Sequence, residues 1–231
     1  MGRVIEDPKL REKIHVFRDR SHAGKMLAEF IREHAQLEDA ILFAIPAGGI
    51  PVAYEISKIL KIPMDLLIVR KIQVPWDPEA GFGAVTWDGE AILNQELVEY
   101  LGLTSEMIEK AVEKTMEVVQ ARVRKFRGGK PMPDVKGRVA ILVDDGLATG
   151  YTMLAAIKSL RKRNPKKIMV AVPTASINAI ELISKEADET LCLNIRSGPI
   201  YAVADAYREW RDLTDEEVME ILEEIRKSRK R

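Results

Sequence analysis

The stretch Val139-Ala-Ile-Leu-Val-Asp-Asp-Gly-Leu-Ala-Thr-Gly-Tyr-Thr152 decides the fold expected for this chain. Its first five residues are apolar and mostly branched, which is typical of a parallel strand covered on both faces. A turn of small residues then leads into an amphipathic segment, residues 152–163, whose spacing predicts a helix. Strand, turn and helix in this order form a βα unit. In open α/β sheets the ligand site lies at the carboxyl ends of such strands.

The residues after this strand suit a phosphorylated sugar. Asp144 and Asp145 are adjacent carboxylates, which repel phosphate but accept hydrogen bonds from neighbouring hydroxyls. The next turn combines exposed amides, two threonine hydroxyls and a helix start, which together suit a phosphate dianion. It comprises Gly146, Leu147, Ala148, Thr149, Gly150, Tyr151 and Thr152. A phosphate beside a diol describes a ribose 5-phosphate. The alternative, that the acids merely cap a helix, stays open on these residues alone.

Similar βα patterns extend in both directions along the chain. Apolar runs at residues 40–45, 65–69, 167–172 and 189–193 alternate with helical spacing at residues 21–34 and 177–187 and with a helix through Tyr54 and Leu60. This alternation predicts a single α/β domain over residues 1–231, with a doubly wound, mostly parallel sheet. We expect an insertion at residues 73–130, which holds a long loop with a β-hairpin and a helix over 104–127. A loop-rich hood at 194–213 and a C-terminal helix at 214–231 complete the prediction.

Composition limits the classes of partner. The chain has 231 residues, of which 46% are hydrophobic and 31% charged, and its 36 basic and 36 acidic residues balance. No overall field therefore attracts DNA or a membrane surface. The lone Cys192 excludes an internal disulfide. No apolar run approaches the ~18 residues of a membrane span and no signal peptide is evident, so a cytoplasmic protein is expected. Asn and Gln total eight, which hints at a heat-adapted source.

The stretch from Leu142 to Thr152 resembles the PRPP-binding motif of the type I phosphoribosyltransferases. A Walker A loop and a G-x-G-x-x-G dinucleotide motif are both absent, so these alternatives fit poorly. The likeness to a bacterial and archaeal subgroup of that family extends from Phe17-Arg-Asp-Arg20 to Thr214-Asp-Glu-Glu-Val218. The resemblance implies transfer of phosphoribosyl from PRPP to a nitrogenous acceptor, with Mg²⁺ and release of pyrophosphate. Asp144 and Asp145 would grip the ribose and contribute weakly to the metal, mostly through substrate and water.

Two other segments correspond to parts of the family's donor site. Pro46-Ala-Gly-Gly49 resembles the pyrophosphate loop, in which backbone amides and often an unusual peptide geometry hold the leaving group, so Ala47, Gly48 and Gly49 would bind pyrophosphate. Related sequences commonly carry Arg where Ala47 stands, and a cation is therefore lost here. Arg70 and Lys71 resemble a catalytic Arg-Lys pair that reaches pyrophosphate. The loop after them, residues 73–90, would close over the substrate.

The hood is where the family recognises its acceptor. Its faint similarity to the 6-oxopurine enzymes implies a nucleobase and purine salvage, with Tyr201, Asp205, Tyr207 and Trp210 as candidate contacts. The apolar stripe of the helix over 104–127 packs either on its own domain or on a second subunit, and a homodimer is expected. The alternative function is a non-catalytic PRPP-sensing regulator, which Ala47 favours. Such a protein would bind RNA or a partner through the basic tail, residues 226–231.

Overall fold

Five apolar residues in a row form β2 (Ala40–Ala44) and again β7 (Val139–Val143), and both strands are fully buried. They lie in the middle of a six-stranded sheet with the order β1-β9-β8-β7-β2-β3, in which every neighbouring pair is parallel. The computed structural model describes residues 1–198 and 200–228. The doubly wound, mostly parallel α/β fold expected from the sequence is confirmed. The other strands are β1 (Arg3–Glu6), β3 (Met64–Leu66), β8 (Lys167–Ser176) and β9 (Glu189–Arg196).

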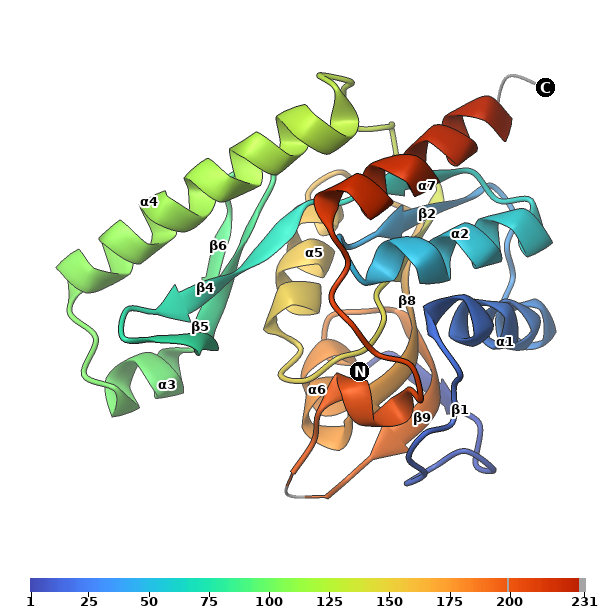
Figure 1. The fold of residues 1–231 in the computed structure, drawn as a ribbon, viewed down its shortest axis with the longest axis horizontal. Coiled ribbons are helices and arrows are strands. Elements are labelled where there is room, and N and C mark those ends of the chain that lie inside the picture. The colour runs from blue at the N-terminus through green and yellow to red at the C-terminus, as the bar shows by residue number, and fades with distance from the viewer. Residues whose placement is uncertain (199, 229–231) are drawn as a thin grey trace.

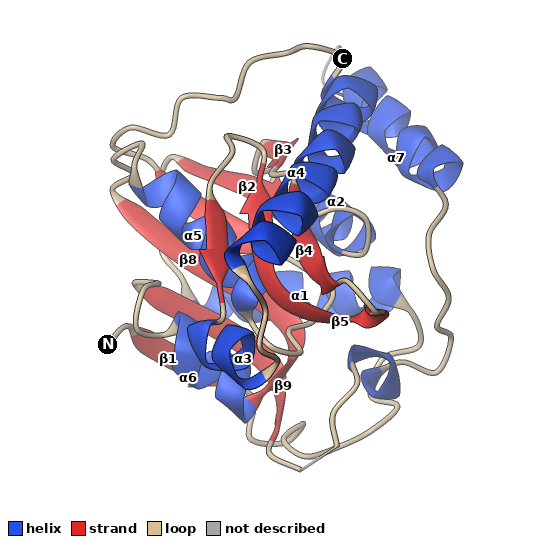
Figure 2. Ribbon diagram, turned by 90° about the vertical axis from the view of Figure 1, so that its left-hand side faces the viewer, coloured by secondary structure: helices blue, strands red, loops and turns tan. Residues whose placement is uncertain are grey.

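Helices cover both faces of this sheet, because successive strand residues point to opposite sides. Leu42 and Ile141 pack in one apolar core, whereas Phe43 and Leu142 pack in the other. Figure 2 shows this layered arrangement. The first core is covered by α1 (Arg20–His34), α2 (Gly49–Leu60) and α7 (Asp215–Ser228), and the second by α5 (Tyr151–Arg161) and α6 (Ile177–Ile183).

The insertion forms a second sheet rather than a long loop. An antiparallel sheet, β4-β5-β6, comprises β4 (Val69–Val74), β5 (Asp77–Thr86) and β6 (Ala91–Leu93). After it come α3 (Gln95–Tyr100) and α4 (Ser105–Arg122), which continues into a π-helical turn, Val123–Arg127. In Figure 1 this part extends to the left of the six-stranded sheet. The single strand predicted over 65–69 is thus wrong, since the chain leaves β3 at Leu66 and starts the second sheet at Val69.

The apolar stripe of α4 packs against the chain's own second sheet. Val119 and Phe126 are buried, and Ile108, Val112 and Met116 are partly covered by the same core. The helix contacts β4 and β5. The stripe therefore has a partner within the chain, and the homodimer stays a prediction. No helix of the described residues is both long and apolar enough to cross a membrane.

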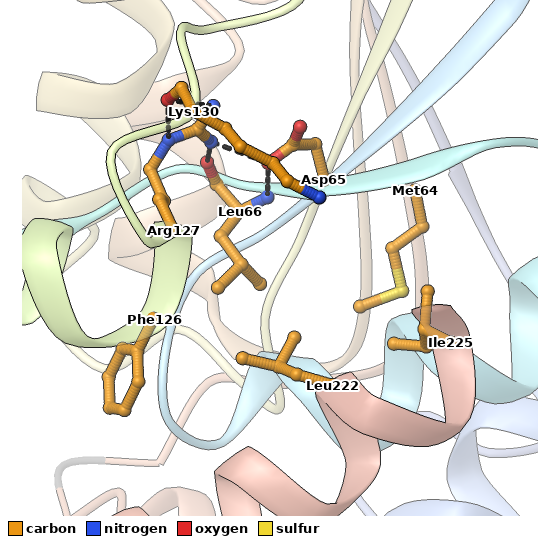
Figure 3. A pocket seen from close by; sticks show the side chains of 8 residues that line it. All are labelled: Met64, Asp65, Leu66, Phe126, Arg127, Lys130, Leu222 and Ile225. Atoms are coloured by element: carbon orange, nitrogen blue, oxygen red, sulfur yellow. Dashed lines mark hydrogen bonds and ion pairs between the residues drawn. The ribbon is translucent and has the colours of Figure 1, made fainter. Parts of the chain in front are cut away.

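A buried arginine joins the end of this insertion to the main sheet. The Arg127 guanidinium donates to the Leu66 carbonyl at 2.8 Å and to the Pro131 carbonyl at 2.7 Å, and it forms an ion pair with Asp65. Figure 3 shows the contacts of Arg127 with Asp65 and Leu66 beside a small cavity of about 60 Å³, which Leu222 of α7 also lines. Arg127 thus ties β3, α4 and the following loop together.

The capping box predicted at the start of the last helix is present. At the start of α7, the Glu217 amide donates to the Thr214 hydroxyl, and the Thr214 amide donates to the Glu217 carboxylate, which is a capping box. Of the basic tail, residues 229–231 lie outside the described residues, as does Pro199 in the hood. The hood holds a short 3-10 turn, Val203–Ala206, and is joined to the segment before α1 by a parallel bridge between Phe17 and Tyr207.

Candidate active site

The strand order reverses between β2 and β7, and the loops after these two strands meet there. From β2 the chain moves outward to β3, whereas from β7 it moves the other way to β8 and β9. Such a switch point opens a crevice at the carboxyl ends of the strands. The Ile45 amide donates to the Val143 carbonyl at 2.9 Å, so the two loops start in contact.

Two glycines let the loop after β2 approach Asp144 and Asp145, the acid pair. A Cβ on Gly48 would lie 1.9 Å from Asp145 Oδ2, and a Cβ on Gly49 would lie 2.6 Å from the Val143 carbonyl oxygen. No larger residue fits at either position without movement. The peptide bond between Pro46 and Ala47 is cis. The residues expected to bind pyrophosphate and those expected to bind ribose are therefore side by side.

Asp144 faces a cavity of about 470 Å³. The phosphate turn, residues 146–152, lines the same cavity together with Lys71 and Val203. Asp144 Oδ1 accepts a hydrogen bond from the Asp145 amide at 2.9 Å. Burial, followed by the negative charge of Asp145, raises the pKa of Asp144 well above its ordinary value. A cation or hydroxyl donor entering the cavity would favour the ionised carboxylate.

The carboxylate of Asp145 has a different hydrogen-bond partner from that of Asp144. Its Oδ2 accepts a hydrogen bond from Arg20 Nε at 2.7 Å, and both side chains are largely covered, with exposed fractions of 14% and 10%. The carboxylate lies against Gly48, and the backbone carbonyl of Asp145 accepts a hydrogen bond from the Tyr207 hydroxyl at 2.6 Å. Asp145 is not among the residues that line the cavity in the part of the chain that the structure describes.

Hydrogen bonds from β8 hold the phosphate turn, and two residues of the turn are exposed to solvent. Leu147 is buried, and its amide donates to the Thr174 carbonyl of β8 at 3.0 Å. The Ser176 hydroxyl, at the end of β8, donates to the Ala148 carbonyl at 2.6 Å. Ala148 and Thr149 are exposed. Gly150 caps α5 in the left-handed region at φ +82°, which favours glycine. The first amides of α5 have no acceptor within the helix and therefore suit an anion.

Of the two cations predicted for pyrophosphate, only one lines the cavity that holds Asp144 in the part of the chain that the structure describes, and this is Lys71. Both line a groove of about 590 Å³ between β4 and α4, together with Lys110 and Lys114. Burial and the nearby charge of Arg122 lower the pKa of Arg70, while Asp215 opposes that change. The structure thus brings Lys71, and not Arg70, to the acid pair.

The four hood residues expected to contact an acceptor all have partners within the chain. The Tyr201 hydroxyl donates to the Thr174 hydroxyl at 3.2 Å, and Asp205 accepts from Arg196 at 3.1 Å. Tyr207 is 2% exposed, and burial raises the pKa of its hydroxyl well above the ordinary value. Trp210 is 37% exposed and stacks on Arg20. Val203, which sequence reasoning missed, is the hood residue that lines the cavity with Asp144.

The donor set of the acid pair fits a magnesium ion that arrives with its substrate. No cluster of three or more His, Cys, Asp or Glu side chains that could hold a metal occurs in the described residues. Mg²⁺ typically takes one or two carboxylates and completes its shell with substrate phosphates and water. Asp144 could supply one carboxylate, and Asp145 could do so only by exchanging its contact with Arg20.

Besides Val203, Arg20 is a residue of the site that the sequence did not single out. It is the first residue of α1, and Asp19 caps that helix by accepting from the His22 amide at 2.7 Å. The local signal is that of an ordinary helix start. Only the fold brings Arg20 to Asp145, 125 residues later in the chain.

Comparison with known proteins places the chain in a family. The family model of the phosphoribosyl transferase domain matches residues 89–206. The chain is 36% identical over 210 residues to a Mycobacterium tuberculosis protein assigned by name to the phosphoribosyl transferases, covering 90% of this chain and 46% of that one. It thus spans about half the length of that curated relative. A uracil phosphoribosyltransferase of Bacillus cereus is 27% identical over 185 residues, which are 79% of this chain and 80% of that enzyme.

A solved structure extends the likeness to the whole fold. The crystal structure of TT1426 from Thermus thermophilus superposes with a TM-score of 0.73 at 36% identity, covering 90% of this chain and 98% of that one. The family model covers half of the chain, and the solved relative shares both its sequence and its fold. The chain therefore belongs to the phosphoribosyl transferase family.

Proposed function

We propose that the chain binds PRPP with Mg²⁺ and transfers its phosphoribosyl group to a nitrogenous acceptor, with a nucleobase as the first candidate. The observation that carries this proposal is the cavity in which Asp144, Lys71 and the phosphate turn face one another, directly beside the glycine loop after β2. A carboxylate, a cation and an amide-lined helix start match the diol, pyrophosphate and 5-phosphate of PRPP.

In the reaction, the bond between ribose C1 and the pyrophosphate oxygen breaks, and that oxygen keeps the electron pair. The lone pair of the acceptor nitrogen forms the new C1–N bond, and the acceptor gives up a proton. Asp144, when ionised, would favour the positive charge that develops on the sugar, while Lys71 would favour the negative charge on the leaving group. The turn around Thr149 anchors the 5-phosphate and so fixes the orientation of C1. Bound Mg²⁺ would neutralise phosphate charge.

The hood forms the proposed acceptor side of the site. The hood packs on the donor site through Val203, whose side chain lies against Gly146 and within the cavity. A planar base could lie between this side chain and the second sheet. Because one relative is a uracil enzyme and the hood resembles that of 6-oxopurine enzymes, both pyrimidines and purines belong in a test. A role in purine salvage is one outcome of that test.

A PRPP-binding regulator is the second candidate, because two observations weaken the pyrophosphate half of the site. Ala47 supplies no cation, and Arg70 lies in another groove. Such a protein would bind PRPP without consuming it. The described residues do not include the end of the basic tail that would contact RNA or a partner.

Pyrophosphate release separates the two candidates. The chain is incubated with PRPP and Mg²⁺ and with hypoxanthine, guanine, adenine, uracil or no acceptor. We expect acceptor-dependent release with at least one base, and its loss in Lys71→Met. Binding of PRPP without release for any base would support the regulator. Sedimentation of the same sample tests the proposed homodimer, and a monomer at working concentration would contradict it.

A further inference from the structure

The turn between β5 and β6, residues 87–90, fastens the second sheet to α5. The Asp88 carboxylate accepts hydrogen bonds from two hydroxyls, that of Ser159 in α5 at 2.9 Å and that of Thr86 at 2.5 Å. Ser159 and Thr86 are both fully buried. A buried hydroxyl that loses its partner is costly, so the Asp88 carboxylate holds the turn at one place on the helix.

Two further contacts join the same turn to the end of α5. Glu90 forms an ion pair with Lys162 at 2.9 Å, and the Arg163 guanidinium carbon lies 4.7 Å from the centroid of the Trp87 ring. A guanidinium over an indole face is held by cation–π attraction. Three side chains of the turn, including Asp88, therefore contact the C-terminal end of the helix.

The pairing of β4 with β5 connects this attachment to Lys71. Thr86 pairs with Val69, and Ala84 pairs with Lys71, two residues further along each strand. That distance is about 7 Å, at 3.4 Å per residue. Residues directly opposite each other in an antiparallel pair point to the same face, and Ala84 and Val69 belong to the apolar core that α5 covers. The Lys71 side chain therefore leaves the second sheet on the face toward α5.

Helix α5 begins at the phosphate turn, so this helix links the two ends of the proposed donor site. Ser159 lies eight residues after Tyr151, or about 12 Å along the helix at 1.5 Å per residue. Lys71 and the phosphate turn line the same cavity. PRPP carries its 5-phosphate and its pyrophosphate on opposite sides of the ribose, and both must meet their partners at once. The attachment near Ser159 thus bears on the separation between Lys71 and the phosphate turn.

We propose that Asp88 and Ser159 are positioning residues, which hold Lys71 at the separation from the phosphate turn that PRPP requires. This inference rests on the proposed PRPP site. Within the described residues, the lining of the cavity includes neither of the two, so they act through β4 and Lys71 rather than on the substrate. Ribose 5-phosphate lacks the pyrophosphate that Lys71 would meet, and its binding should not depend on them.

Calorimetric titration with PRPP and with ribose 5-phosphate, each with Mg²⁺, tests the proposal on Ser159→Ala, Asp88→Ala and Lys71→Met. Ribose 5-phosphate is titrated alone or against bound PRPP. We expect Ser159→Ala and Asp88→Ala each to weaken PRPP binding about tenfold, as for other groups that orient a binding residue from behind, and to leave ribose 5-phosphate binding within about twofold. Lys71→Met should weaken PRPP binding at least as much, and adding Ser159→Ala to it should have no further effect.

Three results would overturn the proposal. An equal loss for both ligands would mean that the contact stabilises α5 and the phosphate turn rather than Lys71. Unchanged PRPP binding in Ser159→Ala, while Lys71→Met weakens it, would mean that Lys71 keeps its place without the contact. Asp88→Asn retains a carboxamide oxygen that can accept from Ser159, so it should recover part of the affinity lost in Asp88→Ala. The absence of any recovery is the third contrary result. If Asp88→Ala does not fold, Ser159→Ala decides.

Lys158→Met is the matched control, because it changes the residue before Ser159. The Lys158 side chain is 40% exposed and reaches Glu186, so both affinities should stay as in the wild type. Urea unfolding of each variant shows that the titrated chain is folded. A wild-type chain that binds no PRPP would overturn the proposed function and this inference with it. Wild-type binding that Lys71→Met leaves unchanged would overturn this inference and leave PRPP binding intact.

Discussion

Asp144 is the residue of the proposed site whose ionisation most clearly affects folding stability. It is a carboxyl group whose pKa is raised, first by burial and then by the charge of Asp145. In the unfolded chain the same group has an ordinary pKa, ~3.9. Between these two pKa values the folded state holds a proton that the unfolded state has lost. Folding stability therefore falls as pH rises through this window.

Asp144→Asn should remove this penalty. We expect the variant to match the wild type near pH 4 and to be more stable at pH 7 to 8, by about 1 kcal/mol or more for each unit of raised pKa. Urea unfolding at a series of pH values measures the difference. The same variant should lose about 100-fold or more in turnover, because the sugar loses its anionic partner. A variant that is less stable than the wild type at pH 8 would contradict the raised pKa.

For single residues, the sequence predicts which neighbours along the chain share the site, but it does not predict which distant residues join them. Asp144, Asp145 and the turn through Thr152 form one uninterrupted motif, so their neighbourhood follows from the chain itself. Arg20 reaches Asp145 only because α1 covers the sheet that contains β7. Even within the motif, the sequence offers no means to tell Asp144, which faces the cavity, from Asp145, which faces Arg20.

At the scale of elements, the loop after β2 and the turn after β7 work as one unit. Their close approach depends on Gly48, whose backbone is helical at φ −61°, so the constraint is steric rather than conformational. A methyl group there would overlap the Asp145 carboxylate, which Arg20 holds in place.

Gly48→Ala should therefore separate the two loops. We expect the free energy of unfolding to fall by about 1–3 kcal/mol, as for other overpacked sites, and PRPP affinity to fall with it. Denaturant unfolding and calorimetry measure the two effects. Gly198→Ala is the matched control, since a Cβ there would meet only the Ile200 carbonyl at an ordinary 3.7 Å. Equal stability of both variants would count against the contact between Gly48 and Asp145.

Elements that are buried on both faces are predictable, and those stabilised by tertiary packing are not. The apolar runs of β2 and β7 are strands as expected. In contrast, β5 contains Asp77-Pro-Glu-Ala-Gly-Phe-Gly, a composition typical of loops, yet it pairs with β4 and β6 and packs on α5. The run predicted at 167–172 continues through Pro173 to Ser176 in β8, past Ala171, the last residue that pairs with β7.

For the whole molecule, the insertion must be held firmly against the main sheet if Lys71 is to reach Asp144. Arg127 supplies one attachment, since its guanidinium bonds Asp65, Leu66 and Pro131 and the residue is only 4% exposed. Arg127→Leu would remove the donor from the carbonyls of Leu66, Lys130 and Pro131 and the ion-pair partner from Asp65. We expect a loss of about 2–4 kcal/mol in the free energy of unfolding.

Thermal and urea unfolding of Arg127→Leu against Arg124→Leu checks this attachment. Arg124 is exposed three residues earlier in the same turn, so its replacement should change stability by less than about 0.5 kcal/mol. If both variants were equally stable, the buried arginine would not join the insertion to the sheet.

The central claim is that the cavity beside Asp144 receives an activated ribose phosphate. Its most direct test is calorimetric titration of the wild-type chain with PRPP and Mg²⁺, alongside ribose 5-phosphate and Asp144→Asn. We predict saturable heat at one site per chain, weaker binding of ribose 5-phosphate because it lacks pyrophosphate, and a large loss of affinity in the variant. No heat with the wild-type chain, or equal affinity of the variant, would contradict the claim.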